Sequence, residues 1–269
     1  MNQKLEQLKR NLKTYDNLAV AFSGGVDSAF LLKTACDVLG SHVLAVTIRS
    51  DIFPVREEEE ARQFCARYGI RQIVCGVDAL KIPGFVQNPK NRCYLCKQKM
   101  MEVITGVAKE QGMFHIAEGS IADDANDYRP GRLAVAESGV ISPLQEAGLT
   151  KEEIRALSAQ MELPTCDKQS FACLASRFVY GEQITKEKLS MVGRAEQLLL
   201  DMGFDQVRVR IHGQMARIEV LPHDFERMLQ ETTRMYVTEK FYEYGFTYVA
   251  MDLQGYRTGS MNKGVNPLI

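Results

Sequence analysis

Short apolar runs alternate with longer amphipathic stretches through the first half of the chain. Buried strands give continuous apolar runs of roughly four to eight residues, whereas helices repeat their apolar positions about every three to four residues. By these patterns we expect strands at residues 17–23, 42–48, 71–77 and 114–117. We expect helices at residues 3–14, 26–39, 55–68 and 95–112. Strands and helices that alternate through short links predict an α/β fold, a doubly wound parallel sheet with helices on both faces.

The pattern changes in the last third of the chain. Residues 206–212 and 215–220 alternate apolar and polar positions around Gly213, which predicts a hairpin. Further helices are expected at 185–202 and 224–242, and a strand at 246–252. We therefore expect a larger domain over residues 1–180 and a smaller α+β domain over residues 181–269.

Two stretches between these regions, residues 118–143 and 163–181, show neither period and are expected to be irregular. Long irregular segments inside compact domains are often functional. Residues 150–161 between them are expected to form a helix that starts with a capping box of Thr150 and Glu153.

The amino-acid composition argues against several classes of protein. Lys and Arg total 33 and Asp and Glu total 34, so the net charge of −1 argues against a general binder of nucleic acids or membrane surfaces. No apolar run approaches the roughly 20 residues that span a bilayer, and the polar N-terminus does not resemble a signal peptide. We expect a cytoplasmic protein, in which seven cysteines serve as buried thiols, metal ligands or reactive groups rather than as disulfides.

The strongest local signal is Ser23-Gly24-Gly25-Val26-Asp27-Ser28, which follows an apolar run and opens a helix. Paired glycines let backbone N–H groups approach an anion, and a helix N-terminus adds partial positive charge. Ser23 and Ser28 add hydroxyl donors, so the loop is expected to bind phosphate, with Asp27 capping the loop or placing Mg²⁺. The competing interpretation is a tight turn without a ligand.

This hexapeptide resembles the PP-loop of the ATP pyrophosphatases, a superfamily that includes GMP, NAD and asparagine synthetases and tRNA-thiolating enzymes. The resemblance implies cleavage of ATP between its α- and β-phosphates, with the loop holding pyrophosphate and a substrate oxygen attacking the α-phosphorus. Ligands of such sheets lie beyond the carboxyl ends of the strands. Ser50 and Gly119 follow the second and fourth strands and are therefore expected near the nucleotide.

Cys93 and Cys96 are three residues apart at the start of a predicted helix. This spacing lets two sulfurs face one metal or cluster. No second Cys-x-x-Cys occurs, but one distant thiol, such as Cys166 or Cys173, would complete a three-cysteine site of the iron–sulfur type. A pair of half-buried structural thiols is the alternative. Three other cysteines fall on apolar positions and are expected in the core: Cys36, Cys65 and Cys75.

Arg208 and Arg210 are two residues apart on a predicted strand and therefore share one face. Two guanidinium groups on one face can hold a phosphate. A solvated strand face is the competing interpretation.

Motifs spread along nearly the whole chain resemble the LarE family of ATP-dependent sulfur insertases, which act in the biosynthesis of the nickel-pincer nucleotide cofactor of lactate racemase. The matching stretches are SGGVDS (23–28), RCYLCK (92–97), NDYRPG (126–131), CLASRFVYG (173–181), VRVRIH (207–212), ARIEV (216–220) and DLQGYRTGSMN (252–262). The resemblance implies adenylation of a carboxylate of a pyridinium dicarboxylate mononucleotide, followed by displacement of AMP by sulfur to give a thiocarboxylate.

The family resemblance offers two sources of sulfur. In one branch an enzyme cysteine five residues before the arginine of the Ser-Arg pair gives up its sulfur; here that position is Ala172. In the other, three cysteines hold a 4Fe–4S cluster. We favour a cluster on Cys93, Cys96 and Cys173, with Cys173 as a sacrificial sulfur donor as the alternative.

The same resemblance implies roles for several other residues. Arg208 and Arg210 grip the 5′-phosphate of the substrate, and Ser176 and Arg177 position substrate or AMP. Lys97 is expected to neutralise charge on the α-phosphate, with a surface lysine as the alternative.

A further set of implied roles concerns metal binding and the loop over the site. Asp127 and Arg129 structure the loop, with Asp127 as a further Mg²⁺ ligand, and Glu196 and Glu219 bind a divalent cation. Solvated positions are the alternative for Glu196 and Glu219. The resemblance also implies a homo-oligomer, with a hexamer among the candidates.

Other interpretations share the same loop. A tRNA-thiolating enzyme would need a basic RNA-binding surface, which the net charge does not indicate. An amide-forming ligase would need a source of ammonia, and a regulatory module would bind ATP without releasing pyrophosphate.

Overall fold

A computed structural model describes residues 1–126, 130–169, 172–257 and 260–262, so Asp127 and Arg129 lie outside the described residues. The chain divides into two compact units. Unit 1 comprises Met1–Ile82 and Asn91–Phe171, and unit 2 comprises Pro83–Lys90 and Ala172–Ile269. The expected boundary of two independent domains at residue 180 stays a prediction.

Unit 1 is built on a four-stranded sheet in the order β3-β2-β1-β4, in which every strand pair is parallel. The strands are β1 (Leu18–Ala21), β2 (Val43–Arg49), β3 (Arg71–Gly76) and β4 (Ile116–Ala117). Each lies within or beside a run that the apolar pattern predicted. The expected parallel α/β fold is therefore confirmed.

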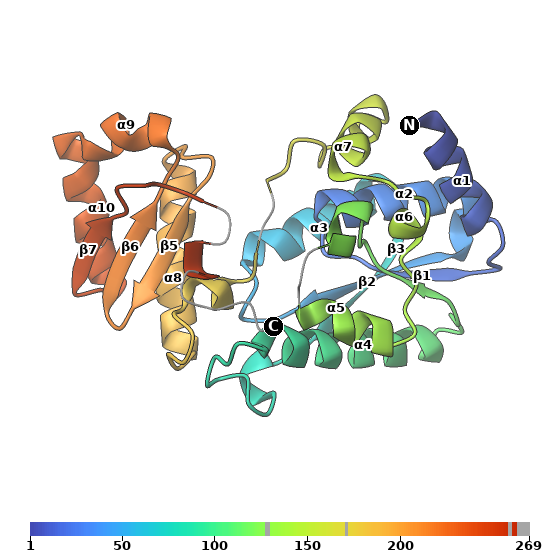
Figure 1. The fold of residues 1–269 in the computed structure, drawn as a ribbon, viewed down its shortest axis with the longest axis horizontal. Coiled ribbons are helices and arrows are strands. Elements are labelled where there is room, and N and C mark those ends of the chain that lie inside the picture. Colours follow the sequence, from blue (N-terminus) through green and yellow to red (C-terminus); the bar gives the residue numbers. More distant parts are fainter. Residues whose placement is uncertain (127–129, 170–171, 258–259, 263–269) are drawn as a thin grey trace. The chain divides into compact units, whose positions relative to one another are not determined.

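Helices cover both faces of this sheet (Figure 1). On one face lie α2 (Val26–Leu39) and α3 (Val55–Arg67), and on the other lies α4 (Arg92–Glu110). Around α2 pack α1 (Asn2–Leu12) and α7 (Lys151–Gln160), with α6 (Pro143–Glu146) against α1. The capping box of Thr150 and Glu153 at the start of α7 is present as predicted.

Part of the stretch expected to be irregular is helical. It contains a short 3₁₀ turn at Ala122–Asn126, helix α5 at Pro130–Glu137 and the beginning of α6. The α5 helix packs along α4, and Tyr94 Oη donates to Glu137 Oε2 across this contact at 2.8 Å. The expectation of an irregular segment over residues 118–143 was wrong, because tertiary packing supports helices too short to show a clear period.

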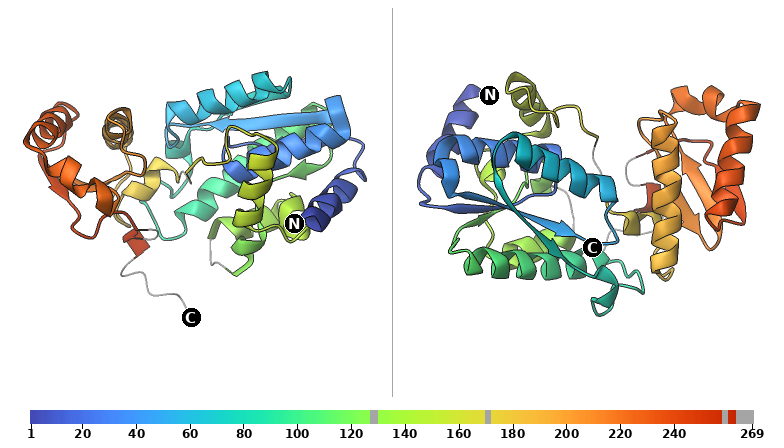
Figure 2. Two further views of the ribbon diagram at one scale, coloured as in Figure 1. Left: turned by 90° about the horizontal axis from the view of Figure 1, so that it is seen from above. Right: turned by 180° about the vertical axis from the view of Figure 1, so that it is seen from behind.

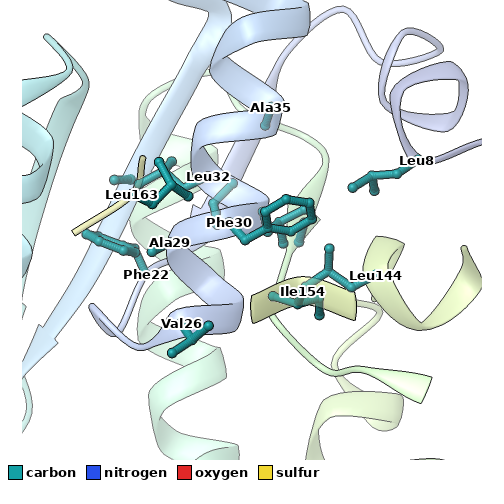
Figure 3. Packing of buried hydrophobic residues seen from close by; sticks show 14 of the residues in the cluster. Leu8, Phe22, Val26, Ala29, Phe30, Leu32, Ala35, Leu144, Ile154 and Leu163 are labelled. Carbon is teal, nitrogen blue, oxygen red and sulfur yellow. The ribbon is translucent and has the colours of Figure 1, made fainter. Parts of the chain in front are cut away.

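The core of unit 1 surrounds α2, which is apolar on most of its circumference. Phe30 points from α2 toward Ile154 of α7 and Leu144 of α6, while Leu32 lies on the side of Phe22 and Leu163 (Figure 3). All these side chains are at most 2% exposed. Because packing on both sides fixes α2, the loop at its N-terminus is held on a rigid element.

Unit 2 contains a three-stranded sheet in the order β5-β6-β7. The predicted hairpin is confirmed as β5 (Arg208–His212) and β6 (Met215–Glu219), which pair antiparallel, and β7 (Tyr248–Met251) adds parallel to β6. Helices α8 (Lys186–Asp201) and α10 (Glu231–Glu243) lie side by side against this sheet (Figure 2). The single helix expected over residues 224–242 is instead broken at Gln230, which has ψ of 138° between α9 (Phe225–Leu229) and α10.

Among the described residues, no helix has the length and apolar character needed to cross a membrane.

Candidate functional site

The predicted phosphate loop connects β1 to α2 in a conformation that exposes backbone donors. Gly24 has φ of +75°, which a residue with a Cβ rarely adopts. A Cβ at Gly24 would also lie 3.2 Å from Cβ of Ala61 on α3. Gly25 is the N-cap of α2, and in the described part of the chain no side chain caps this helix N-terminus. The first N–H groups of α2 are therefore in place to bind an anion.

Two serine hydroxyls border the loop. Ser23 Oγ and Ser28 Oγ are 3.1 Å apart and share a hydrogen bond, and Gly25 N–H donates to Ser23 Oγ at 3.4 Å. Ser28 Oγ also donates to Gly25 O at 3.1 Å. These contacts are long or bifurcated, so the donors can turn to a stronger acceptor such as a phosphate oxygen at little cost.

Asp27 lies in the first turn of α2 and forms an ion pair with Lys151 at the start of α7. Burial raises the pKa of Asp27, and the nearby Lys151 only partly offsets that effect. Oδ1 of Asp27 is buried and has no hydrogen-bond partner among the described residues. This carboxylate therefore has an unused oxygen that suits a hard cation such as Mg²⁺.

The other predicted nucleotide residues lie at the carboxyl edge of the sheet. A Cβ at Gly119 would lie 3.0 Å from Ser28 N, so only glycine allows the chain after β4 to approach the loop this closely. Ser50 directly follows β2, and its buried Oγ has no hydrogen-bond partner within the described residues. The structure brings Gly119 against the loop and places Ser50 at the same edge.

Lys168, which the sequence analysis did not single out, contacts the loop from the segment after α7. Its Nζ donates to Gly24 O at 3.0 Å and to Glu57 Oε2 at 2.7 Å, and lies 2.6 Å from Glu60 Oε2. Arg155 fixes the backbone of the same segment by donating to Cys166 O at 2.5 Å and to Lys168 O at 2.7 Å.

Cys93 and Cys96 lie in the first turns of α4. In a β–α–β unit the helix returns antiparallel to the strands, so α4 begins at the same sheet edge as the phosphate loop. Cys93 is exposed, whereas Cys96 is buried with its Sγ 3.8 Å from Sδ of Met100. Lys97 is half-buried next to the pair.

The core assignment agrees with the surroundings of Cys65 and Cys36, whereas Cys75 is not among the described residues of the core cluster. Cys65 is buried, and Cys36 and Cys75 are half-buried. Burial raises the pKa of Cys65 to about 12 and that of Cys36 to about 11, so both stay protonated at neutral pH. Neither thiol is suited to nucleophilic chemistry.

In unit 2, Arg177 is fully buried at the end of a 3₁₀ turn, Leu174–Arg177. Its Nε and Nη2 donate to the two carboxylate oxygens of Glu196 on α8 at 2.7 and 2.8 Å. Nη1 donates to Ser176 Oγ at 2.7 Å and to Cys173 O at 3.3 Å. Arg177 therefore fixes the backbone of the Cys173 segment to α8.

A second buried ion pair lies on the sheet. Arg210 donates through Nε and Nη2 to Glu219 Oε2 at 3.1 and 2.9 Å, and through Nη1 to Ser176 O at 3.2 Å. The other oxygen of Glu219 accepts from Arg217 at 3.1 Å and from Ser260 Oγ at 2.8 Å. Glu196 and Glu219, which the resemblance assigns to a divalent cation, thus have their carboxylates occupied by arginines, and their metal role stays a prediction.

Arg208 shares a strand face with Arg210 and is also buried. Its guanidinium lies 5.2 Å from the ring centroid of Tyr256, a residue of the 252–262 stretch to which the sequence analysis gave no role. Burial, together with repulsion from Arg177, lowers the pKa of Arg208 to about 10. Because burial and repulsion destabilise the charged form of Arg208, an anion bound next to it would stabilise that form.

Cys173 is half-buried at the N-cap of the turn that carries Ser176 and Arg177. It belongs to unit 2, whereas Cys93 and Cys96 belong to unit 1. Among the residues that the structure describes, no group of three or more His, Cys, Asp and Glu side chains is arranged to hold a metal ion. The three-cysteine site therefore stays a prediction.

Comparison with known proteins finds relatives that align with nearly the whole chain or with about two thirds of it. An uncharacterised protein of Synechocystis sp. is 39% identical over 263 residues, 98% of both chains. The pyridinium-3,5-bisthiocarboxylic acid mononucleotide synthase of Lactiplantibacillus plantarum is 36% identical over 252 residues, 93% of this chain and 91% of the synthase. One of the subunits of the glutamine-hydrolysing GMP synthase of Methanothermobacter thermautotrophicus is 29% identical over 67% of this chain and 61% of its own length. No family model matches the chain.

Proposed function

The chain belongs to the LarE family of pyridinium-3,5-bisthiocarboxylic acid mononucleotide synthases, and from this premise we propose that it is an ATP-dependent sulfurtransferase. Its substrate is pyridinium-3,5-dicarboxylate mononucleotide, in which it replaces a carboxylate oxygen by sulfur. The identity with the Lactiplantibacillus synthase over nearly the whole chain carries this proposal. The phosphate loop, which GMP synthases share as PP-loop enzymes, supports the use of ATP.

In the first step a carboxylate oxygen of the substrate attacks the α-phosphorus of ATP. The bond between the α-phosphorus and the bridging oxygen breaks, giving an acyl adenylate and pyrophosphate. The N–H groups of Gly25 and the first turn of α2, with the hydroxyls of Ser23 and Ser28, bind the departing pyrophosphate. Asp27 would hold Mg²⁺, whose positive charge would stabilise the phosphates, because its Oδ1 has no hydrogen-bond partner among the described residues. Lys97 would offset charge on the α-phosphate.

In the second step a sulfide sulfur attacks the acyl carbon. The acyl–oxygen bond to AMP breaks, AMP leaves with its phosphate oxygen, and the proton of the sulfide passes to solvent. The product is a thiocarboxylate. Because AMP is a much better leaving group than oxide, adenylation supplies the driving force for sulfur insertion.

We propose that Cys93, Cys96 and Cys173 hold a 4Fe–4S cluster. Thiolates are the usual ligands of such clusters, and the Cys93–Cys96 spacing at a helix start suits two of them. When bound, the cluster supplies a site for an additional sulfide. The alternative is that Cys173 gives up its own sulfur.

In unit 2 we propose that Arg208 and Arg210 hold the 5′-phosphate of the substrate, while Arg177 and Ser176 position the substrate or AMP. Burial, and after it repulsion from Arg177, lowers the pKa of Arg208, and this supports the proposal because a bound phosphate would stabilise the charged guanidinium. Arg210 reaches the same strand face already oriented by Glu219.

The function is tested by incubating the anaerobically purified protein with ATP, Mg²⁺, sulfide and the dicarboxylate nucleotide. We expect pyrophosphate release that depends on the nucleotide, and a product in which mass spectrometry shows sulfur in place of oxygen. ATP binding with no pyrophosphate release under these conditions would leave only a nucleotide-binding module.

The sulfur source is tested by iron and acid-labile sulfide analysis of the same preparation. A cluster predicts both elements and repeated turnover. Absence of both after reconstitution, together with loss of hydrogen sulfide mass from the protein on turnover, would assign the sulfur to Cys173. Light scattering tests the homo-oligomer that we also propose.

A further inference from the structure

We infer that Lys168 is a positioning residue of the phosphate loop, which fixes the peptide between Gly24 and Gly25 so that its N–H faces the bound pyrophosphate. This inference rests on the proposed use of ATP at the loop. It concerns a residue 144 positions away from Gly24 in the sequence and not part of any motif identified there.

The ammonium of Lys168 donates hydrogen bonds to Gly24 O and Glu57 Oε2 and forms a further ion pair with Glu60. An ammonium has three N–H donors, and Nζ lies 3.0 Å from Gly24 O, 2.7 Å from Glu57 Oε2 and 2.6 Å from Glu60 Oε2. The side chain is 16% exposed. Two carboxylates of α3 thus pair with the ammonium, and one of its N–H groups donates to the loop.

The effect on the loop follows from peptide geometry. In a trans peptide the C=O and the following N–H point in opposite directions. Lys168 holds Gly24 O toward α3, so Gly25 N–H points to the other side, where it meets Ser23 Oγ. Glycine accepts several backbone conformations at similar cost. Without an external contact, the peptide after Gly24 would therefore rotate more freely.

The backbone of Lys168 is itself anchored. Arg155 of α7 donates to Lys168 O and to Cys166 O. Lys151, one turn earlier on α7, forms the ion pair with Asp27 in the first turn of α2. Helix α7 therefore contacts the loop region directly through Lys151, and it anchors the segment whose Lys168 donates to Gly24 O.

A direct contact between Lys168 and phosphate is the competing role, and the two roles predict opposite effects of the glutamates. If Glu57 and Glu60 orient Lys168 toward Gly24 O, removing their charges loosens the loop and weakens ATP binding. If Lys168 instead binds phosphate, the glutamates compete with ATP, and removing their charges strengthens binding.

The experiment compares Lys168→Met and the double variant Glu57→Gln/Glu60→Gln with Lys33→Met as a matched control. Lys33 is 20% exposed, and among the described residues its ammonium pairs with one carboxylate, that of Asp37, which is not part of the loop. The readouts are KM and kcat for ATP-dependent pyrophosphate release, calorimetric binding of inorganic pyrophosphate, and melting temperature. Where the double variant does not fold, Glu60→Gln alone reports the sign, because Glu60 is 48% exposed.

We expect Lys168→Met to weaken pyrophosphate binding and to raise KM for ATP by about tenfold or more. This factor corresponds to the loss of one hydrogen bond that involves a charged group. The glutamate variant should shift both values in the same direction, and Lys33→Met should leave them unchanged. Unchanged binding in Lys168→Met, or tighter binding in the glutamate variant, would overturn the inference. If the wild-type protein binds neither ATP nor pyrophosphate, the proposed function fails instead.

Discussion

Replacing Glu196 by glutamine tests whether the buried ion pair with Arg177 holds unit 2 together. The carboxylate accepts two guanidinium hydrogen bonds and the backbone N–H of Val209 at 2.9 Å. Glutamine has nearly the same shape but no charge, and its NH₂ group would face the N–H groups of Arg177. Because Arg177 is fully buried, water cannot replace the lost carboxylate.

The expected loss is large for a single substitution. Breaking a buried ion pair by removing one partner costs about 3–5 kcal/mol, since the remaining charge is uncompensated. For a unit of roughly one hundred residues this lowers the melting temperature by about 10 °C or more. Glu102→Gln is the matched control: its partner Lys99 is on the surface of α4, and such pairs contribute about 1 kcal/mol or less.

Unfolding is followed by far-UV circular dichroism and calorimetry, because the chain contains no tryptophan. The wild type and both variants are measured with and without EDTA. A structural ion pair predicts that Glu196→Gln destabilises the protein equally in both conditions. A melting temperature as little changed as that of Glu102→Gln would refute the reasoning, and a loss of stability in the wild type on adding EDTA would favour a metal role for Glu196.

Three further predictions concern the two binding regions. Burial raises the pKa of Asp27, so the protein loses stability as pH rises through that pKa and Asp27 becomes charged. Asp27→Asn should therefore raise the melting temperature at neutral pH. The same substitution should weaken Mg²⁺-dependent ATP binding, measured by calorimetry. Gly119→Ala places a methyl group 3.0 Å from Ser28 N and should weaken ATP binding by about tenfold or more through displacement of the loop, measured by ATP titration. Inorganic phosphate should raise the melting temperature of the wild type, and Arg208→Leu should reduce this gain to the part that the phosphate loop contributes, because the lost guanidinium is a proposed phosphate ligand.

The elements with strong local signals could be predicted from the sequence. Helix α2 begins at Val26 and ends at Leu39 as expected, because a glycine turn precedes it and Gly40 follows it. The capping box of α7 was also predictable, because both of its residues lie within one turn of the chain. Helices α5 and α6 were missed, since eight and four residues are too few to show a period.

The supporting contacts of the site could not be predicted in the same way. Lys151 and Asp27 are 124 positions apart, and Lys168 and Gly24 are 144 positions apart. Lysines that pair with glutamate or aspartate are common on protein surfaces, so the presence of a lysine in the sequence does not indicate a contact with the phosphate loop. The alternation of β5 did predict that Arg208 and Arg210 share a face, but not that both are buried or that Glu219 holds one of them.

The charges at the proposed phosphate site indicate which group should control the pH dependence of substrate binding. With a pKa of about 10, Arg208 is still positively charged at neutral pH, and a bound phosphate would raise that pKa further. By linkage, loss of its proton weakens phosphate binding only in strongly alkaline solution. A phosphate monoester, in contrast, gains its second negative charge near pH 6. Substrate affinity should therefore rise as pH increases through about 6 and then stay level to about pH 9. The rise is caused by the second ionisation of the substrate phosphate, not by titration of a protein group.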